Sequence, residues 1–191
     1  MTTTATDSWP FDPLRGEPPI TPGCVAWGDV VVSEPELAAS AWARFDATKH
    51  HVLATLRADG SPRVSGSEVI LHDGVLALGS MFRAVKAEDL RRDGRFALHS
   101  NPGDGSMEGG DAKISGVAVE LGGELAAAIA AELPQEVPEP FHLFRLDVAQ
   151  VVLSEVDHER NCMVIRSWWP SRGLVVAERG VSVAGTAGRR S

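Results

Sequence analysis

Cysteine, lysine and long apolar stretches are scarce in this sequence of 191 residues. Its two cysteines, Cys24 and Cys162, lie far apart and have no further cysteine or histidine at metal-ligand spacing. This pattern favours reduced thiols and no metal site, with one disulfide as the alternative. No stretch approaches the roughly 20 apolar residues that span a bilayer, and residues 1–10 lack the basic start and apolar run of an export signal. We therefore expect a cytoplasmic protein with no membrane partner.

An excess of basic residues is also missing. The formal net charge is −8, the pI is about 5.2, and the basic residues form no cluster. Because binding to nucleic acid requires a basic face that neutralises phosphates, we expect no nucleic-acid partner. The sequence contains neither a Ser-His-Asp constellation nor paired carboxylates, so we assign no catalytic residue. Any reaction would then depend on the chemistry of a bound cofactor.

The length and an apolar content of 43% suffice for one sizeable core, so we predict a single domain with extensions. Five prolines among small polar residues make residues 1–23 an extended N-terminal arm. Residues 24–179 are expected to form the domain, and residues 180–191 a flexible C-terminal tail. Residues 33–36 have the pattern of a capping box, and residues 37–45 continue it as a helix with one apolar face.

Short apolar segments separated by turn residues predict a mostly β fold with flanking helices. Asp59-Gly60 is typical of a tight hairpin because both residues tolerate positive φ, and His72-Asp73-Gly74 marks a second turn. Helices are expected at residues 84–93 and 123–133. Strands are expected at residues 51–57, 63–71, 75–78, 95–99, 111–119, 141–156 and 161–168.

The strand expected at residues 63–71 has an unusual polar face. Arg63, Ser65 and Ser67 alternate along it and so lie on one face. Gly66 has no side chain, so a flat ligand can approach the backbone there closely. The alternative is a strand bulge or a strand that faces solvent.

The connection that follows the strand at residues 75–78 is the best candidate for binding chemistry. Ser80 supplies a hydroxyl, Arg83 a planar guanidinium and Lys86 a compact positive charge, beside the free N–H groups of a helix start. Together they can hold a phosphate. The alternative is that Arg83 and Lys86 are ordinary solvated residues. The chain has only three lysines, and Lys86 is one of them, which favours a specific role.

The order of these features resembles the FMN-binding split-barrel family, which is the pyridoxamine 5′-phosphate oxidase-like superfamily. The similarity covers about residues 34–121 and resumes at residues 141–174. It is carried by the hairpin, the polar strand, the run Gly-Ser…Lys-Ala-x-Asp-Leu-Arg-Arg-Asp-x-Arg-Phe-Ala-Leu at residues 79–98, and the closing Trp-x-Pro-x-x-Gly segment at residues 168–173. Many relatives carry adjacent basic residues before the short helix, whereas two other residues separate Arg83 from Lys86 here.

This resemblance implies a six-stranded antiparallel split β-barrel. It also implies that Ser80, Arg83 and Lys86 hold the cofactor phosphate, and that residues Arg63 through Ser67 border its ring. The family is dimeric with the cofactor at the subunit interface, so the resemblance further implies a homodimer that buries more than roughly 2,000 Å².

Two further residues are candidates for the cofactor site. Lys113 shares with Ser115 the face opposite Ile114 in the strand expected at residues 111–119. Trp168 and Trp169 point to opposite faces if extended, so that one reaches a pocket or interface while the other packs. We include Trp168 with Lys113 among the predicted cofactor contacts.

The leading interpretation is a flavin- or deazaflavin-dependent oxidoreductase that acts on a small molecule. We place FMN first and a deazaflavin of the F-420 type second. A deazaflavin adds a polyanionic tail, and Arg91, Arg92 and Arg95 are the nearby cations that would bind it. One alternative is a non-catalytic binder of flavin, deazaflavin or haem. The other is a β-barrel interaction module without a small molecule.

Overall fold

The computed structural model describes residues 18–103, 107, 109–132 and 140–180. Most of the predicted arm and almost all of the predicted tail therefore lie outside the described residues. The helices are α1 (Trp27–Ser33), α2 (Pro35–Asp46), α3 (Val85–Arg92) and α4 (Gly123–Ala131). The strands are β1 (His51–Leu56), β2 (Pro62–Ser67), β3 (Ile70–His72), β4 (Val75–Met81), β5 (Arg95–His99), β6 (Asp111–Glu120), β7 (Phe141–Asp157), β8 (Cys162–Trp169) and β9 (Gly173–Gly180).

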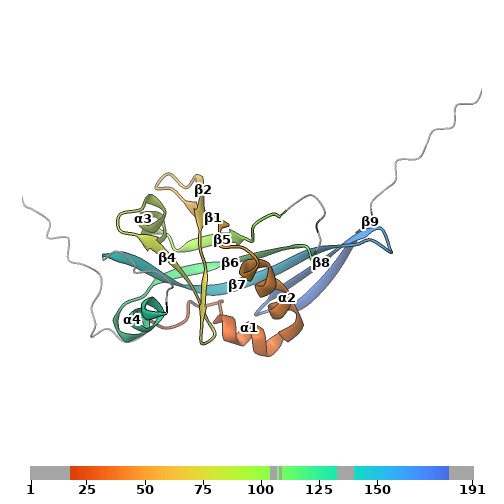
Figure 1. Ribbon diagram of the computed structural model, residues 1–191, viewed down its shortest axis with the longest axis horizontal. Helices are drawn as coiled ribbons and strands as arrows, with labels where there is room; N and C mark the ends of the chain where they lie inside the picture. Colours follow the sequence, from red (N-terminus) through yellow and green to blue (C-terminus); the bar gives the residue numbers. More distant parts are fainter. Residues whose placement is uncertain (1–17, 104–106, 108, 133–139, 181–191) are drawn as a thin grey trace, which may run out of the picture.

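The strands form one antiparallel sheet with helices around it, which confirms the mostly β fold (Figure 1). The strand order is β2-β1-β5-β6-β7-β4-β3, and β8 and β9 continue from β7. The predicted six-stranded barrel is not confirmed, because the described residues contain nine strands and the end strands β2 and β3 do not pair with each other. One reason is that the single strand expected at residues 63–71 breaks at Glu68 and Val69, so that β2 pairs with β1 and β3 pairs with β4.

Both predicted hairpin turns are present. The β1–β2 hairpin closes with Leu56 opposite Pro62, and Gly60 has a φ of +81°. In the β3–β4 hairpin, Asp73 and Gly74 have φ values of 45° and 79°. A two-residue turn with both central residues in the left-handed region matches the twist of the flanking strands. The two turn residues therefore determine the local register of the β3–β4 hairpin, whereas residues 57–61 connect β1 to β2 and only Gly60 of the predicted Asp59-Gly60 pair has a positive φ.

Three parts of the chain differ from the sequence-based expectation. The capping box at residues 33–36 is wrong, because Ser33 is the last residue of α1 and Glu34 caps α2 without a side-chain hydrogen bond. Helix α1 itself was not predicted. Residues 173–180 lacked a predicted strand, but they form β9 along β8. The apolar face of α2 is confirmed, since Leu37 and Phe45 are among its buried residues.

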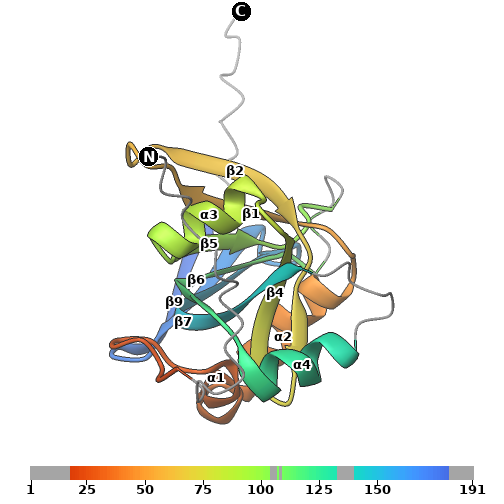
Figure 2. The same cartoon turned by 90° about the vertical axis from the view of Figure 1, so that its left-hand side faces the viewer.

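The helices cover different parts of the sheet (Figures 1 and 2). Helices α1 and α2 pack on each other and contact β6, β7 and β4, and their side chains belong to the main core. Helix α4 contributes Ala126 and Ile129 to a smaller cluster with Phe141 and Leu143 of β7. Helix α3 packs on β1, β4 and β6 at the end of the sheet where the polar strand β2 lies. None of the helices in the described ranges is long and apolar enough to cross a membrane.

Strand β7 is the centre of the sheet. It pairs with β6 along most of its length, while β4 pairs with its first part and β8 with its second part. The register with β6 shifts between Ser115 and Gly116. A Cβ on Gly116 would lie 1.9 Å from the carbonyl oxygen of Asp147, so only glycine permits this close approach.

A buried ion pair on β7 holds the described end of the N-terminal arm. Arg145 Nε lies 2.7 Å from Asp147 Oδ1, and both residues are buried. Arg145 also donates to the carbonyls of Pro18 and Pro19 at 2.8 and 2.9 Å, and Asp147 accepts from the Thr21 N–H at 2.7 Å. The pair thus satisfies the backbone of a segment without regular structure.

Candidate functional site

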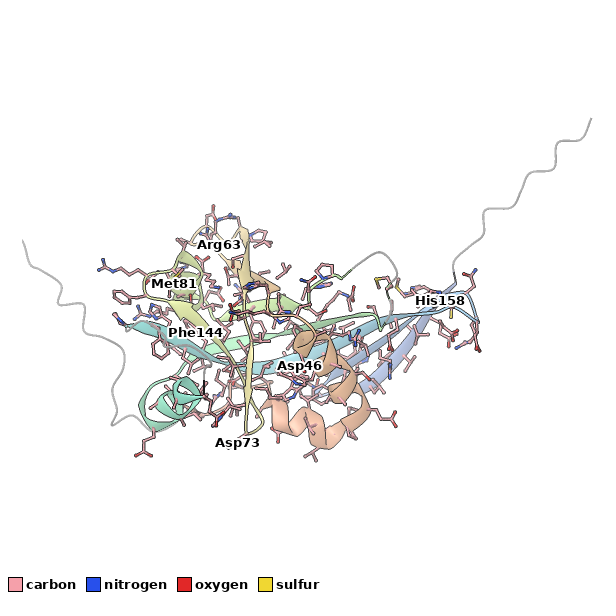
Figure 3. All side chains as sticks on the ribbon, in the orientation of Figure 1. Asp46, Arg63, Asp73, Met81, Phe144 and His158 are labelled. Carbon is pink, nitrogen blue, oxygen red and sulfur yellow. The ribbon has the colours of Figure 1, made fainter. Side chains whose placement is uncertain are left out.

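Most of the predicted phosphate and ring contacts gather at one end of the molecule. Strand β2, the end of β4, the turn that follows it and the start of α3 meet there. In Figure 3, Arg63, Met81 and Phe144 lie at this end, and His158 lies at the opposite end. We call this region the α3 site.

Lys86 connects α3 to β2. Its Nζ donates to the carbonyl oxygen of Gly66 at 2.7 Å and lies 3.4 Å from Ser67 Oγ. Burial lowers the pKa of the Lys86 ammonium, and the nearby Glu68 carboxylate opposes this shift. Within the described ranges, no carboxylate lies at ion-pair distance from Lys86. The ammonium is thus partly withdrawn from water without a direct counter-ion, which leaves it suited to bind an anion.

Buried hydroxyls without partners accompany this charge. The Oγ atoms of Ser65 and Ser80 are both buried, and neither has a hydrogen-bond partner in the described part of the chain. Leaving a buried hydroxyl unpaired costs about 1–3 kcal/mol, so such atoms call for an explanation. Gly66 is exposed, and a Cβ added there would meet no atom within 4 Å. The hydroxyls and the ammonium are groups that a phosphate binds, and the open backbone at Gly66, on the face of β2 opposite Ser65, admits a flat ring.

Arg63 is brought to the same end but has an internal partner. Its Nε lies 2.5 Å from Asp89 Oδ2, and Thr55 Oγ1 donates to the same oxygen at 3.0 Å. Arg92 Nη2 lies 2.9 Å from the other oxygen, Oδ1, of Asp89. Burial disfavours the charged form of Asp89, but these hydrogen bonds outweigh it and hold the pKa of the carboxyl below its usual value. The predicted polar face of β2 is therefore present, and its Arg63 side chain binds Asp89 of α3.

Arg83 lies in the turn between β4 and α3. Its φ of 58° places a residue other than glycine in the left-handed region, a conformation that clusters at functional sites. The Arg83 guanidinium carbon lies 5.5 Å from the centre of the Phe82 ring, and its backbone N–H donates to His142 Nε2 at 3.4 Å. His142 is fully buried, its Nδ1 lies 2.6 Å from Glu120 Oε1, and its ring stacks between Phe82 and Phe144. The buried cluster around His142 therefore packs against the turn that carries Phe82 and Arg83.

Lys113 and Trp168 lie away from Lys86. In the sheet register, Gly66 is followed across the strands by Val52, His99 and then Lys113, which places Lys113 three strands from β2. Lys113 contacts Asp111 and Ser154 instead. Trp168 is buried in the main core. The structure of a single chain thus does not bring these two residues to the α3 site.

The three arginines expected to bind a polyanionic tail all have carboxylate partners. Arg91 Nε lies 3.1 Å from Glu120, Arg92 Nη2 2.9 Å from Asp89, and Arg95 Nη2 2.6 Å from Asp93. Arg95 lowers the pKa of Asp93 to about 2. Each positive charge is therefore largely compensated within the chain.

Sequence reasoning missed two parts of this region. Asp89 lies three residues after Lys86, on the α3 face that also carries the buried Ala87 and Leu90, so a carboxylate on an apolar helix face was the available signal. The contact between the buried His142 and Glu120 is the other part. No sequence spacing links these two residues. Among the described residues, no group of three potential ligands could hold a metal ion.

Comparison with known proteins gives structural matches only. Neither the protein-family models nor the curated proteins yielded a match. PhzG from Burkholderia lata 383, solved in complex with tetrahydrophenazine-1-carboxylic acid, has a TM-score of 0.54 and 15% identity, over 80% of this chain and 92% of its own. HutZ, the heme storage protein from Vibrio cholerae, has a TM-score of 0.51 and 20% identity, over 63% of this chain and 94% of its own.

A protein from Clostridium acetobutylicum, described as related to general stress protein 26 of B. subtilis and as of the pyridoxinephosphate oxidase family, is similar at 10% identity and a TM-score of 0.46. It covers 81% of this chain and 96% of its own length. At these identities, the two matches with TM-scores above 0.5 identify the fold and leave the ligand open. The resemblance predicted from the sequence is confirmed at that level: the chain shares the fold of the pyridoxamine 5′-phosphate oxidase-like split-barrel proteins.

Proposed function

We propose that the α3 site binds FMN through its phosphate and that the protein is a flavin-dependent oxidoreductase acting on a small molecule. The observation that carries this proposal is the combination of three groups at one end of the sheet. They are the Lys86 ammonium and the buried hydroxyls of Ser65 and Ser80, and within residues 18–103, 107, 109–132 and 140–180 the ammonium has no direct counter-ion and the hydroxyls have no partner. A phosphate accepts hydrogen bonds from all three groups and neutralises the charge. Such charge-assisted bonds contribute about 1.5–3 kcal/mol each.

FMN is preferred over a deazaflavin because of the charges beyond Lys86. A deazaflavin tail adds several negative charges, which need uncompensated cations. Arg91, Arg92 and Arg95 each contact a carboxylate, and the Arg92–Asp89 contact is also part of the buried network with Arg63. These contacts reduce the positive charge that is available to the tail.

The site is completed by a second copy of the chain in this proposal. Met81 is 80% exposed and Val85 57% exposed, and the partly exposed Phe82 lies between them on the turn that leads to Lys86. Large apolar side chains around a cation are costly in water and typical of an interface. A homodimer that covers this turn would also cover the second face of a flat ring.

The chemistry divides between the cofactor and the chain. Bound FMN supplies the electron or hydride transfer. Lys86 would hold the phosphate, the hydroxyls of Ser65 and Ser80 would fix its orientation, and the turn at Phe82 and Arg83 would exclude water together with the partner subunit. We assign no proton donor, because the buried His142 is already engaged with Glu120 and the Arg83 N–H.

An absorbance spectrum of the purified protein, followed by titration of the apo protein with FMN, a deazaflavin and haem, tests this proposal. We expect the tightest binding for FMN, reduction of the bound FMN by a nicotinamide donor, and sedimentation of the FMN-bound protein as a dimer. Tighter binding of haem, without reduction of FMN, would favour a non-catalytic haem binder. A protein that binds none of the three would contradict the proposal and favour an interaction module.

A further inference from the structure

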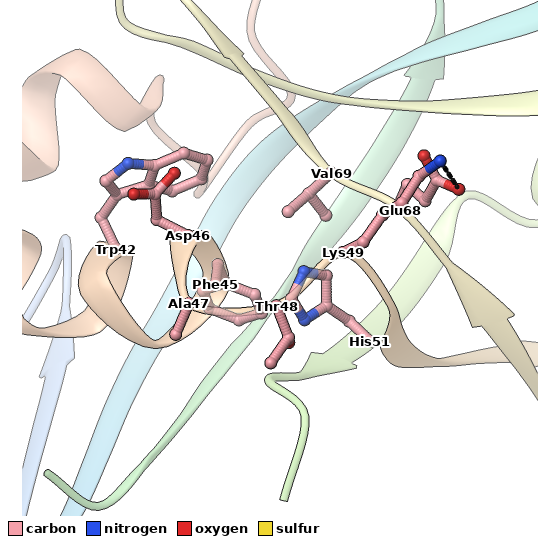
Figure 4. A pocket seen from close by; sticks show the side chains of 9 residues that line it. All are labelled: Trp42, Phe45, Asp46, Ala47, Thr48, Lys49, His51, Glu68 and Val69. Atoms are coloured by element: carbon pink, nitrogen blue, oxygen red, sulfur yellow. Dashed lines mark ion pairs between the residues drawn. The ribbon is translucent and has the colours of Figure 1, made fainter. Parts of the chain in front are cut away.

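A pocket lies near the α3 site and is lined by a different set of residues. It has a volume of about 350 Å³ and lies where the end of α2, the start of β1 and the break between β2 and β3 meet (Figure 4). We call it the α2 pocket. Its lining residues are Trp42, Phe45, Asp46, Ala47, Thr48, Lys49, His51, Glu68 and Val69.

The sheet geometry explains why this space exists. Strand β2 pairs with β1 up to Ser67, which lies opposite His51, and the chain joins β4 only from Ile70 onward. Glu68 and Val69 therefore cross between two ladders without belonging to either. Helix α2 ends beside this crossing at Asp46, so neither a strand nor a helix fills the gap.

The charge of the α2 pocket is negative. Asp46 and Glu68 contribute carboxylates, and the C-terminal carbonyls of α2 add a partial negative charge. Lys49 is the only lysine or arginine in the lining, and its Nζ lies 3.5 Å from Glu68 Oε1, with both side chains roughly half exposed. Exposed ion pairs of this kind contribute about 0–1 kcal/mol, so another cation can readily replace Lys49.

His51 gives the pocket an unpaired polar group. The residue is 3% exposed, and its buried Nδ1 has no hydrogen-bond partner in the described part of the chain. Burial lowers the pKa of His51 and the neighbouring His50 adds to this shift, while Glu68 and the Phe45 backbone partly oppose it, so the neutral imidazole is favoured. The Phe45 ring meets the imidazole edge-on at 5.1 Å, and Trp42 and Val69 add further apolar surface.

We propose that the α2 pocket binds a small organic cation. Its positive group lies against Glu68 in the place of the Lys49 ammonium, and its flat apolar part extends past Val69 toward Trp42 and Asp46 on the other side of the pocket (Figure 4). A polar atom of the ligand faces His51. This site is distinct from the α3 site in sign of charge, although Ser67 and Glu68 are neighbours on the chain, and its occupation does not depend on FMN.

The test uses the full-length protein without added cofactor and phenethylamine, which is a cation at pH 7, as the probe. Phenethyl alcohol has the same ring and no charge, so it serves as the matched neutral compound. Binding is followed by the ¹⁵N and ¹H resonances of His51 and of the Trp42 indole in NMR titrations. We expect phenethylamine to shift both sets of resonances and to bind at least several-fold more tightly than the alcohol.

Two substitutions change the charge of the α2 pocket in opposite directions. Glu68→Gln removes the main anion at nearly constant shape and should weaken phenethylamine binding about threefold to tenfold. Lys49→Gln removes the competing ammonium and should strengthen it. Glu178→Gln removes an exposed carboxylate on β9 that pairs with Arg160. It changes the net charge by the same amount as Glu68→Gln, so it controls for long-range effects.

A general change in the fold would alter the phenethylamine affinity of all three variants in the same direction. The opposite effects expected for Glu68→Gln and Lys49→Gln exclude that explanation. Equal affinity for phenethylamine and phenethyl alcohol would overturn the proposal. So would an affinity that falls in Lys49→Gln, or one that falls as much in Glu178→Gln as in Glu68→Gln. Failure of FMN to bind would leave this result untouched, because no step of the test involves FMN.

Discussion

Lys86 and Asp89 lie less than one turn apart on α3, and their surroundings are opposite in kind. Asp89 is buried and receives hydrogen bonds from Thr55, Arg63 and Arg92, so its charge is fully compensated within the chain. Among the residues that the structure describes, Lys86 meets a carbonyl and a hydroxyl but no carboxylate. The first group is complete without any ligand. The second has hydrogen-bonding capacity and charge left over.

This difference separates two reasons for placing charged residues at one end of a sheet. A complete network fixes α3 against β1 and β2, so it contributes to the stability of the fold. An incomplete one has charge and hydrogen-bonding capacity left for a ligand, which is the role that we propose for Lys86. The two groups share the helix, so changing each in turn measures structure and binding separately.

The largest expected effect is on stability. Asp89→Asn keeps the shape of the side chain but leaves Arg63 and Arg92 without a counter-charge. Breaking a buried pair costs about 3–5 kcal/mol, and we expect about 3 kcal/mol because both arginines remain partly exposed. The midpoint of urea unfolding measures this loss. Asp93→Asn, at the exposed end of the same helix, is the control, and an equal loss there would contradict a structural role for Asp89.

The contribution of Asp89 should also depend on pH. A carboxyl whose folded pKa lies below its unfolded value stabilises the fold fully above the unfolded pKa, which is about 3.9 for aspartate. That stabilisation is lost as the pH falls through the lower folded pKa. The difference in unfolding free energy between wild type and Asp89→Asn should therefore be constant from pH 7 to about pH 5 and shrink below about pH 4. A difference that grows on acidification would show that the folded pKa is raised.

Lys86→Met tests the binding half of the comparison. Methionine keeps the apolar stem and removes the charge, so FMN affinity should fall roughly 10- to 150-fold while the unfolding midpoint changes little. Added salt should weaken FMN binding more in the wild type than in the variant, since it screens an attraction that the variant lacks. Arg179→Met, an exposed cation at the end of β9, serves as the control for net charge. Unchanged affinity in Lys86→Met would place the phosphate elsewhere.

The smallest effect is the most diagnostic for an unpaired hydroxyl. Ser80→Ala removes a buried oxygen without a partner, so the apo protein should be as stable as the wild type or up to about 1 kcal/mol more stable. FMN affinity should fall about threefold to tenfold, because one donor to the phosphate is lost. Isothermal titration and urea unfolding give the two numbers. A loss of stability without a loss of affinity would mean that Ser80 serves the fold.

Local signals made much of the fold predictable. Gly60 and the pair Asp73-Gly74 take positive φ in the two hairpin turns, and the apolar face of α2 follows from residue spacing. The break at Glu68 and Val69 could not be read in the same way. The alternating pattern continues through it, and only the long-range choice of partner strand decides where β2 ends.

The candidate site was predictable as a set of residues and less so as a set of contacts. Lys86, Ser67 and Gly66 do meet, as the polar strand and the helix start suggested. Arg63 is 26 residues from Asp89, and nothing local indicates that the two form an ion pair. The role of an arginine depends on which carboxylate the fold delivers to it, and that information lies in the tertiary structure.

The central position of β7 has a consequence for motion. An amide exchanges its hydrogen with solvent only when its hydrogen bond opens. Opening β7 breaks its pairing on both sides, with β6 on one side and with β4 or β8 on the other. Among the described strands, β9 pairs only with β8. We therefore expect the amide hydrogens of β9 to exchange first. The amide hydrogens of β7 should exchange last, and β7 also holds the backbone of Pro18 and Pro19 through Arg145.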